Sequence, residues 1–305
     1  MTSSTSSPSA TSLPELLSRK LIFVGGKGGV GKTSVSKALA QALARASARK
    51  KVLWVEFEAP DSPAGELKPV APGLWHLNCD AGIAFEEYLA LRLGGSTLAR
   101  FFLQNRLIRY LAKAAPGVHE LVLLGKIWHE RDQYDHIVVD MRSTGYGIAM
   151  FQSTENFARL FQGGPIHRDA GEMIRTFQDP AQTGNLIVAL PEEMPLRESL
   201  DLRDRLLALF PGNPPAFVVN RRFPDLSGLP ESAAIGNPDD WSTPVAHSAR
   251  DYALKRSRLE DFNLRLWREA KVPFGELGFI PPPPQGDGEL LARLCDQLLA
   301  RGWIQ

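Results

Sequence analysis

One glycine-rich segment constrains the fold of this chain more than any other feature. Residues Gly26 to Thr33 read GKGGVGKT and fit the pattern G-x-x-x-x-G-K-[ST] at every fixed position. The segment follows a short apolar run, 20–24 (KLIFV), and leads into 33–46, which is rich in Ala, Leu and Lys. We therefore expect a buried strand, a tight turn and a helix in that order. The glycines let successive backbone N–H groups of the turn point at phosphate oxygens.

The helix that opens at this turn adds the partial positive charge of its N-terminus to the phosphate site. With a nucleoside triphosphate bound, Lys32 is expected to bridge the β- and γ-phosphates, and the Thr33 hydroxyl to bind Mg²⁺. Asp140 ends the apolar run HIVVD, where a carboxylate is expected to hold the same ion, usually through water. The residues expected to line the phosphate site are Gly26, Gly28, Gly29, Val30, Gly31, Lys32, Thr33 and Ser34.

Strand-like and helix-like segments alternate along most of the remaining chain. Further strands are expected at 51–57, 74–78, 136–140, 185–190, 216–220 and 276–281, and helices at 195–210, 248–270 and 288–301. Such alternation predicts a mainly parallel sheet covered by helices on both faces. Together with the glycine turn, it indicates an α/β fold of the P-loop NTPase type.

Two helical blocks, about 85–130 and 149–177, interrupt the alternation and are expected to form a helical insertion subdomain on the sheet. Residues 1–14 are dominated by Ser, Thr and Pro, which predicts a disordered tail. The rest, 15–305, is expected to form a single P-loop domain.

Net charge and composition limit the classes of partner that the chain is expected to bind. The 305 residues carry a formal net charge of +1, which argues against a dedicated nucleic-acid partner. The N-terminus lacks a signal peptide, and no apolar stretch approaches the roughly 18–20 residues that span a bilayer. A cytoplasmic protein without an integral membrane segment is expected. For Cys79 and Cys295, reduced buried thiols are favoured, with a disulfide left open.

Lys27 is a second lysine in the loop, more charge than one triphosphate site needs from a single chain. The sequence GGKGGVGKTS resembles the deviant Walker A loop of the ParA, MinD, nitrogenase iron protein and ArsA group of ATPases. This resemblance implies that ATP is the nucleotide, that the active species is a nucleotide-sandwich dimer, and that Lys27 reaches the partner's phosphates. A solvated surface lysine is the alternative.

Segments further along resemble the ArsA and tail-anchored-protein targeting ATPases in particular. These are 190–206 (LPEEMPLRESLDLRDRL), 218–224 (VVNRRFP) and 279–284 (FIPPPP). The resemblance implies that Asn220 reads the adenine edge, for which an amide offers both a donor and an acceptor. It also implies adenine contacts from Pro281 and Pro282. The alternatives are an asparagine that caps a strand and prolines that end one.

Two segments depart from that family. Its second switch reads D-x-A-P-T-G-H; here Asp140, Thr144 and Gly145 match it, whereas Arg142, Ser143 and Tyr146 do not. The resemblance implies that the Gly145 N–H senses the γ-phosphate. Where the family has an aspartate that positions the attacking water, this chain has Glu58, whose reach is longer by about 1.5 Å. We therefore expect Glu58 to polarise water, with Asp61 as a nearby substitute, and slow or partner-dependent hydrolysis.

The leading hypothesis is a slowly hydrolysing ATPase that acts as a dimer, paired with itself or with a related ATPase subunit, and that serves a protein client. A nucleotide-dependent assembly module with vestigial hydrolysis is the second hypothesis, and a ParA- or MinD-like positioning ATPase the third. The helical blocks contain many arginines and the chain has only five methionines, which favours packed core over a cargo groove. There is no cysteine cluster to bind arsenite.

Overall fold

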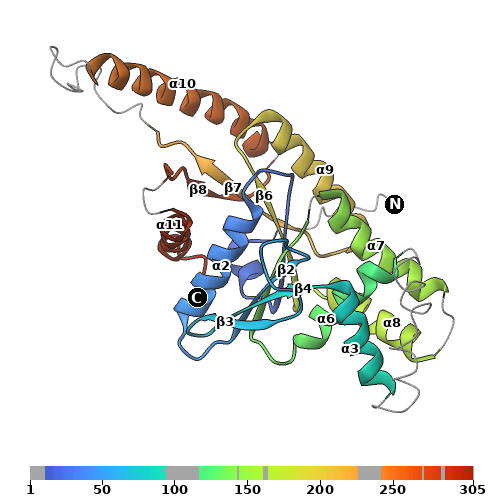
Figure 1. Ribbon diagram of the computed structural model, residues 1–305. Helices are drawn as coiled ribbons and strands as arrows, with labels where there is room; N and C mark the ends of the chain where they lie inside the picture. Colours follow the sequence, from blue (N-terminus) through green and yellow to red (C-terminus); the bar gives the residue numbers. More distant parts are fainter. Residues whose placement is uncertain are drawn as a thin grey trace, which may run out of the picture.

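The computed structural model describes residues 11–93, 117–142, 144–160, 164–225, 242–269, 271–282 and 286–304. Within them, eight strands form one sheet in the order β3-β4-β2-β5-β1-β6-β7-β8 (Figure 1). The strands are β1 (Leu21–Gly25), β2 (Val52–Phe57), β3 (Leu67–Ala71), β4 (Leu74–Cys79), β5 (His136–Asp140), β6 (Thr183–Ala189), β7 (Ala216–Arg222) and β8 (Phe274–Gly278). Only β3 runs antiparallel to its neighbour, so the predicted mainly parallel α/β sheet is confirmed.

Helices cover both faces of the sheet. They are α1 (Leu13–Leu17), α2 (Lys32–Ala46), α3 (Ala81–Leu93), α6 (Val118–Glu130), α7 (Thr144–Leu160), α8 (Gly164–Gln178), α9 (Glu193–Leu209), α10 (Ser242–Glu269) and α11 (Asp287–Ala300). One apolar core lies between the sheet and α1, α2 and α11, and the other between the sheet and α6 to α10. Figure 1 shows α2 and α11 on one side and α6 and α8 on the other.

In the central strand β1, residues 21–24 are all apolar because both faces of the strand are buried. In β1, Leu21 and Phe23 belong to one core, and Ile22 and Val24 belong to the other. None of these four side chains is more than 1% exposed. The alternation of side chains across the sheet thus gives β1 a contact with each helical layer.

Two elements were not anticipated from the sequence. β3 contains a proline and is mostly exposed, as an edge strand tolerates, and its sequence LKPVA has little strand character. α1 begins at Leu13, inside the range expected as tail, because Ser12 caps the helix and its leucines are buried. Residues 1–10, which belong to the expected tail, and residues 94–116, which belong to the first helical block, lie outside the described residues.

The fold brings the expected functional segments to the carboxyl ends of the parallel strands, which form one edge of the sheet. β1 lies between β5 and β6, and Val24 pairs in register with Asp140. In parallel α/β sheets, ligands bind beyond the carboxyl ends of the strands, where neighbouring connections diverge. The loops that follow β1, β2, β5, β7 and β8 all leave the sheet at this edge.

The two cysteines are buried and free. Cys79 lies in the core beneath α6 and α7, and Cys295 lies in the core beneath α2 and α11, on the other face of the sheet. The favoured alternative, reduced thiols, is therefore the one found. Across the described ranges, no helix combines the length and the apolar character that crossing a bilayer requires.

Candidate nucleotide site

The glycine loop connects β1 to α2 in a conformation that side chains would block. Gly26 has φ 139°, and a Cβ there would lie 2.3 Å from the carbonyl oxygen of Val188. Gly31 has φ 89°, and a Cβ there would lie 2.5 Å from Nδ2 of Asn220. Glycine is thus required both for the left-handed backbone and for the close approach of β6 and β7. Val30 is buried and anchors the loop in the core beneath α2.

Lys32 begins α2 and folds back over the loop. Its Nζ donates a hydrogen bond to the backbone oxygen of Lys27 at 2.9 Å, so the ammonium spans the mouth of the turn. Burial lowers the pKa of Lys32, and the nearby Asp140 carboxylate opposes that shift. An anion bound in the loop would be stabilised by this ammonium and by the N-terminus of α2.

Thr33 and Asp140, the two expected metal ligands, lie side by side. The Thr33 hydroxyl donates to Oδ2 of Asp140 at 2.6 Å, although the two residues are 107 positions apart in the chain. Oδ1 of Asp140 is buried and has no hydrogen-bond partner among the described residues. Burial raises the pKa of Asp140 to about 6, against the hydrogen bond from Thr33 and the charge of Lys32.

This pair fits a hard divalent cation. Mg²⁺ prefers oxygen ligands, is commonly held by one or two protein oxygens, and fills its remaining positions with water and phosphate. The orphaned oxygen of Asp140 supplies a lone pair that a cation or its water would satisfy. Thr33 and Asp140 would therefore hold the ion from α2 and β5, beside the loop.

Lys27 contacts a residue that the sequence analysis did not single out. Its Nζ lies 2.7 Å from Oε1 of Glu198 on α9, and both side chains are partly exposed. Oε2 of Glu198 is buried without a hydrogen-bond partner among the described residues. In this conformation, Lys27 is neutralised by its own chain. Glu198 lies within the 190–206 segment, so the resemblance there was the signal that could have pointed to it.

Glu58 follows β2 in a left-handed backbone conformation, with φ 48°. Oε1 lies 3.1 Å from Nε2 of His119 on α6, and Oε2 lies 3.0 Å from Nη1 of Arg142. The Arg142 guanidinium also packs over the ring of Tyr146, 5.0 Å from its centroid. Each oxygen of the expected water-positioning carboxylate thus has one side-chain partner. His119 carried no sequence signal, because it lies in a helical block without a motif.

Gly145 lies in the first turn of α7, just after the Arg142 segment. It is exposed, and a Cβ there would meet nothing within 4 Å. Its backbone is therefore open to a ligand at the carboxyl edge of β5.

Asn220 is buried near the end of β7, where its amide braces the glycine loop. Its Nδ2 donates to the Val30 carbonyl at 2.9 Å, and its Oδ1 accepts from the Arg221 N–H at 2.9 Å. An amide nitrogen has two donors and its oxygen has two lone pairs, so one of each is left for a base. Pro281 and Pro282 follow β8 and are exposed.

The two loops on this side of the sheet touch each other. The Phe279 N–H donates to the Arg222 carbonyl at 2.7 Å. The rings of Phe223 and Phe279 stack with their centroids 4.6 Å apart and their planes 14° apart. The structure thus brings Asn220, Pro281 and Pro282 to one region, three to four strands away from β5, which carries Asp140.

Residues 19–163 match the family described as anion-transporting ATPase. This range contains the glycine loop, Glu58, Asp140 and Gly145, and it ends before β7 and β8.

Similar proteins are named as ATPases. ATPase BagA of Mycobacterium tuberculosis (strain H37Rv) is 30% identical over 228 residues, covering 67% of this chain and 66% of its own length. The ATPase ASNA1 homolog of Entamoeba dispar is 25% identical over 239 residues, covering 62% and 72%. ATPase GET3 of Kluyveromyces lactis is 26% identical over 192 residues, covering 55% of each. The chain thus spans just under two thirds of the mycobacterial relative. With the fold and the glycine loop, these findings show that the chain is similar to the ArsA-like anion-transporting ATPases, with the family match over residues 19–163.

Proposed function

We propose that this chain binds Mg²⁺·ATP at the carboxyl end of β1 and hydrolyses it slowly as a nucleotide-switched dimer. The observation that carries the proposal is the Thr33–Asp140 pair, 2.6 Å apart at the mouth of the glycine loop. A hydroxyl and a buried carboxylate beside such a loop are the ligands that the nucleotide's metal ion requires.

The residues of the loop have separate roles in this proposal. Lys32 exchanges the Lys27 carbonyl for the β- and γ-phosphates, while the N–H groups of Gly28 to Thr33 donate hydrogen bonds to the remaining phosphate oxygens. When bound, Mg²⁺ neutralises charge that develops on the transferring phosphoryl group. The N–H of Gly145, an exposed residue, reports the γ-phosphate to α7.

Glu58 is the residue on which turnover depends. Each of its oxygens has one side-chain partner, and release of His119 or Arg142 would leave an oxygen fully free to orient a water for in-line attack. Its contacts with His119 and Arg142 link that release to α6 and to the segment after β5. This supports a slow basal rate, which rises when a partner or client moves those segments.

Lys27 connects nucleotide binding to dimer formation. It has to leave Glu198 before it can reach the phosphates of a second subunit, and a partly exposed ion pair of this kind contributes only about 0–1 kcal/mol. The ion pair therefore holds Lys27 only weakly, so that Lys27 can leave it at a small cost in free energy. The partner is a second copy or a related ATPase subunit, and a protein client would read the dimer's state through the helical segments.

A second candidate function is an assembly module that binds ATP without useful hydrolysis. The two side-chain contacts of Glu58 favour it, since they compete with a water for both oxygens of that carboxylate.

Phosphate release from ATP separates the two functions. We would compare the wild-type chain with Glu58→Ala and with Lys32→Ala, which loses the phosphate contact and sets the background rate. For an ATPase, Glu58→Ala keeps its ATP affinity and loses roughly 10²- to 10⁴-fold in turnover, the range for a general base.

The exposed Glu66, paired with Lys68 near β3, offers a matched control, and Glu66→Ala should behave like the wild type. If the wild type binds ATP yet turns it over no faster than Lys32→Ala, the assembly module is correct and the catalytic proposal fails. Absence of ATP binding in the wild type would contradict both.

A further inference from the structure

Arg221 lies at the glycine loop without a partner for its charge. Its Nη2 is 4.0 Å from the position that a Cβ on Gly31 would occupy. Its side chain is exposed, and no carboxylate of the described residues lies within ion-pair distance of it. The backbone has φ 60°, which is unfavourable for a residue with a side chain. Such strain persists where the surroundings impose it, and it is concentrated at ligand sites.

The order of strands identifies which end of a nucleotide meets Arg221. The metal pair lies between β1 and β5, so the γ-phosphate end of a triphosphate points to the β5 side. Arg221 is the last residue but one of β7, two strands from β1 in the opposite direction, or roughly 10 Å at the usual strand spacing. The nucleoside therefore leaves the loop toward β7 and β8, where Asn220, Phe279 and Pro281 lie.

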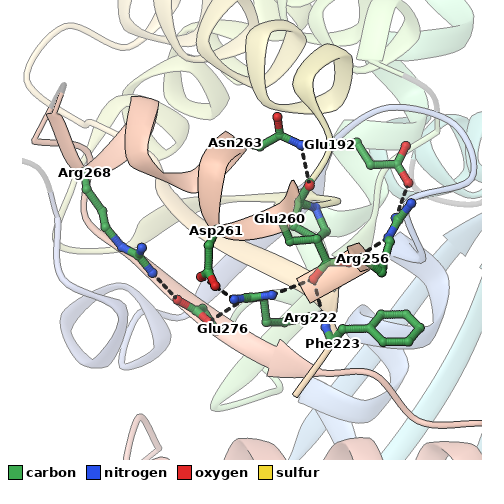
Figure 2. Close-up of polar contacts among 10 residues, drawn as sticks. Glu192, Arg222, Phe223, Arg256, Glu260, Asp261, Asn263, Arg268 and Glu276 are labelled. Atoms are coloured by element: carbon green, nitrogen blue, oxygen red, sulfur yellow. Dashed lines mark hydrogen bonds and ion pairs between the residues drawn. The ribbon is translucent and has the colours of Figure 1, made fainter. Parts of the chain in front are cut away.

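The neighbouring arginine is held in the opposite state. Arg222 is buried and surrounded by carboxylates: Nη1 lies 2.7 Å from Glu260, Nε lies 3.5 Å from Glu276, and Asp261 contacts Nη2. Figure 2 shows the guanidinium of Arg222 enclosed by these three acidic side chains from α10 and β8. Two adjacent arginines thus differ completely, one neutralised inside the fold and the other left uncompensated at the site.

Glu260 fixes the backbone of this turn. It is fully buried, and it accepts hydrogen bonds from Arg222, from Nε of Arg256 at 2.8 Å, and from the Phe223 N–H at 2.9 Å (Figure 2). On its other side, the Arg221 N–H donates to Asn220. Hydrogen bonds therefore hold the turn 220–223 at both ends, and the Arg221 side chain is left without an ion-pair partner among the described residues.

We propose that Arg221 is a nucleotide-binding residue that packs its guanidinium plane against the purine base, and that Glu260 and Arg222 hold it in that position. The inference rests on the proposed ATP site and deepens it by assigning the base contact. A planar guanidinium stacks on an aromatic face and adds cation–π attraction, which an ammonium group reproduces poorly.

Ligand affinities measured by calorimetry test this assignment. The probes are Mg²⁺·ATP, Mg²⁺·ADP and Mg²⁺·tripolyphosphate, the last of which lacks a base. Arg221→Ala should weaken ATP and ADP alike, by roughly 3- to 30-fold for a cation–π contact, and leave tripolyphosphate within about twofold. Arg221→Lys keeps the charge without the plane and should recover little of the lost affinity.

The exposed Arg45, near the far end of α2 and paired with Asp296, provides a matched control, because Arg45→Ala removes the same charge away from the site. Equal losses for ATP and tripolyphosphate, or full recovery by Arg221→Lys, would make Arg221 a phosphate contact and overturn the proposal. Unchanged ATP affinity in Arg221→Ala would also overturn it. Failure of the wild type to bind ATP would instead remove the proposed function.

Discussion

Burial makes the ionised form of the Asp140 carboxyl group less favourable than it would be in water. Asp140 is 9% exposed, one oxygen has no hydrogen-bond partner in the described structure, and burial raises its pKa to about 6. A carboxylate kept in this state is less stable in the nucleotide-free protein than an uncharged group would be. The cation site is thus built at the expense of stability.

Replacing Asp140 with asparagine should therefore stabilise the nucleotide-free chain while removing its response to Mg²⁺. A pKa raised from 3.8 to about 6 means that ionisation favours the unfolded state. At about 1.4 kcal/mol per unit, this sets an upper limit of about 3 kcal/mol on the gain at neutral pH. The penalty is absent below about pH 4, develops as the pH rises to about 6, and is constant above it.

Chemical unfolding of both proteins in EDTA across this pH range, together with ATP affinity with and without Mg²⁺, measures both effects. Lower stability of Asp140→Asn at neutral pH, or retained Mg²⁺ dependence of its ATP affinity, would show that Asp140 is not a strained metal ligand.

Some single residues could be assigned from the sequence because their chemistry fixes their spacing. Lys32 and Thr33 belong to a motif in which backbone geometry and phosphate contact require those residue types. Glu198 and His119 could not be found in this way, since each meets its partner only through the packing of α9 or α6. Arg221 and Arg222 are indistinguishable in the sequence and opposite in the structure, because burial alone decides which one is neutralised.

At the scale of elements, α10 is bound to the sheet by charge as well as by apolar packing. Its fully buried Glu260 joins Arg222 of β7, and Trp267 packs edge-to-face against Phe217 of the same strand. Arg256 extends this network to Glu192 before α9 (Figure 2). The network therefore ties α9, α10, β7 and β8 together at the edge of the sheet where the base is proposed to bind.

Glu260→Gln should destabilise the fold, because it leaves Arg222 and Arg256 without the anion they share. Breaking a buried charge pair from one side costs roughly 3–5 kcal/mol, and the retained amide oxygen places the expected loss near the lower end. Denaturant unfolding with Glu269→Gln, an exposed position on the same helix, as control measures it. A loss equal to that of the control would mean that Glu260 contributes no more than a surface charge.

Regular elements could be predicted where both faces of a strand or one stripe of a helix are buried. The strands around β1 and most of α10, which begins six residues before the expected start at residue 248, follow from such patterns. β3 could not, since an exposed edge strand with a proline has little periodic signal. The short α1 was missed because its burial against β6 and β7 depends on residues far along the chain, including the contact of Arg19 with Asn213.

At the scale of the whole molecule, the site extends along the carboxyl ends of the strands from β5 to β8 and, in our proposal, across two subunits. The side with the glycine loop and Asp140 matches the family, while the side with β7 and β8 lies beyond the matched residues. Lys27 lies at this edge with Glu198 as its partner, which supports a resting state from which dimer formation withdraws it.

The molecular mass of the chain in solution tests this switch most directly. Light scattering with Mg²⁺·ADP should give a mass near the 33.6 kDa of one chain. A non-hydrolysable ATP analogue with Mg²⁺ should give close to twice that mass, and Lys27→Ala should remain near the single-chain value with either nucleotide. A wild-type mass near 33.6 kDa with both nucleotides, in samples shown to have bound them, would contradict the account.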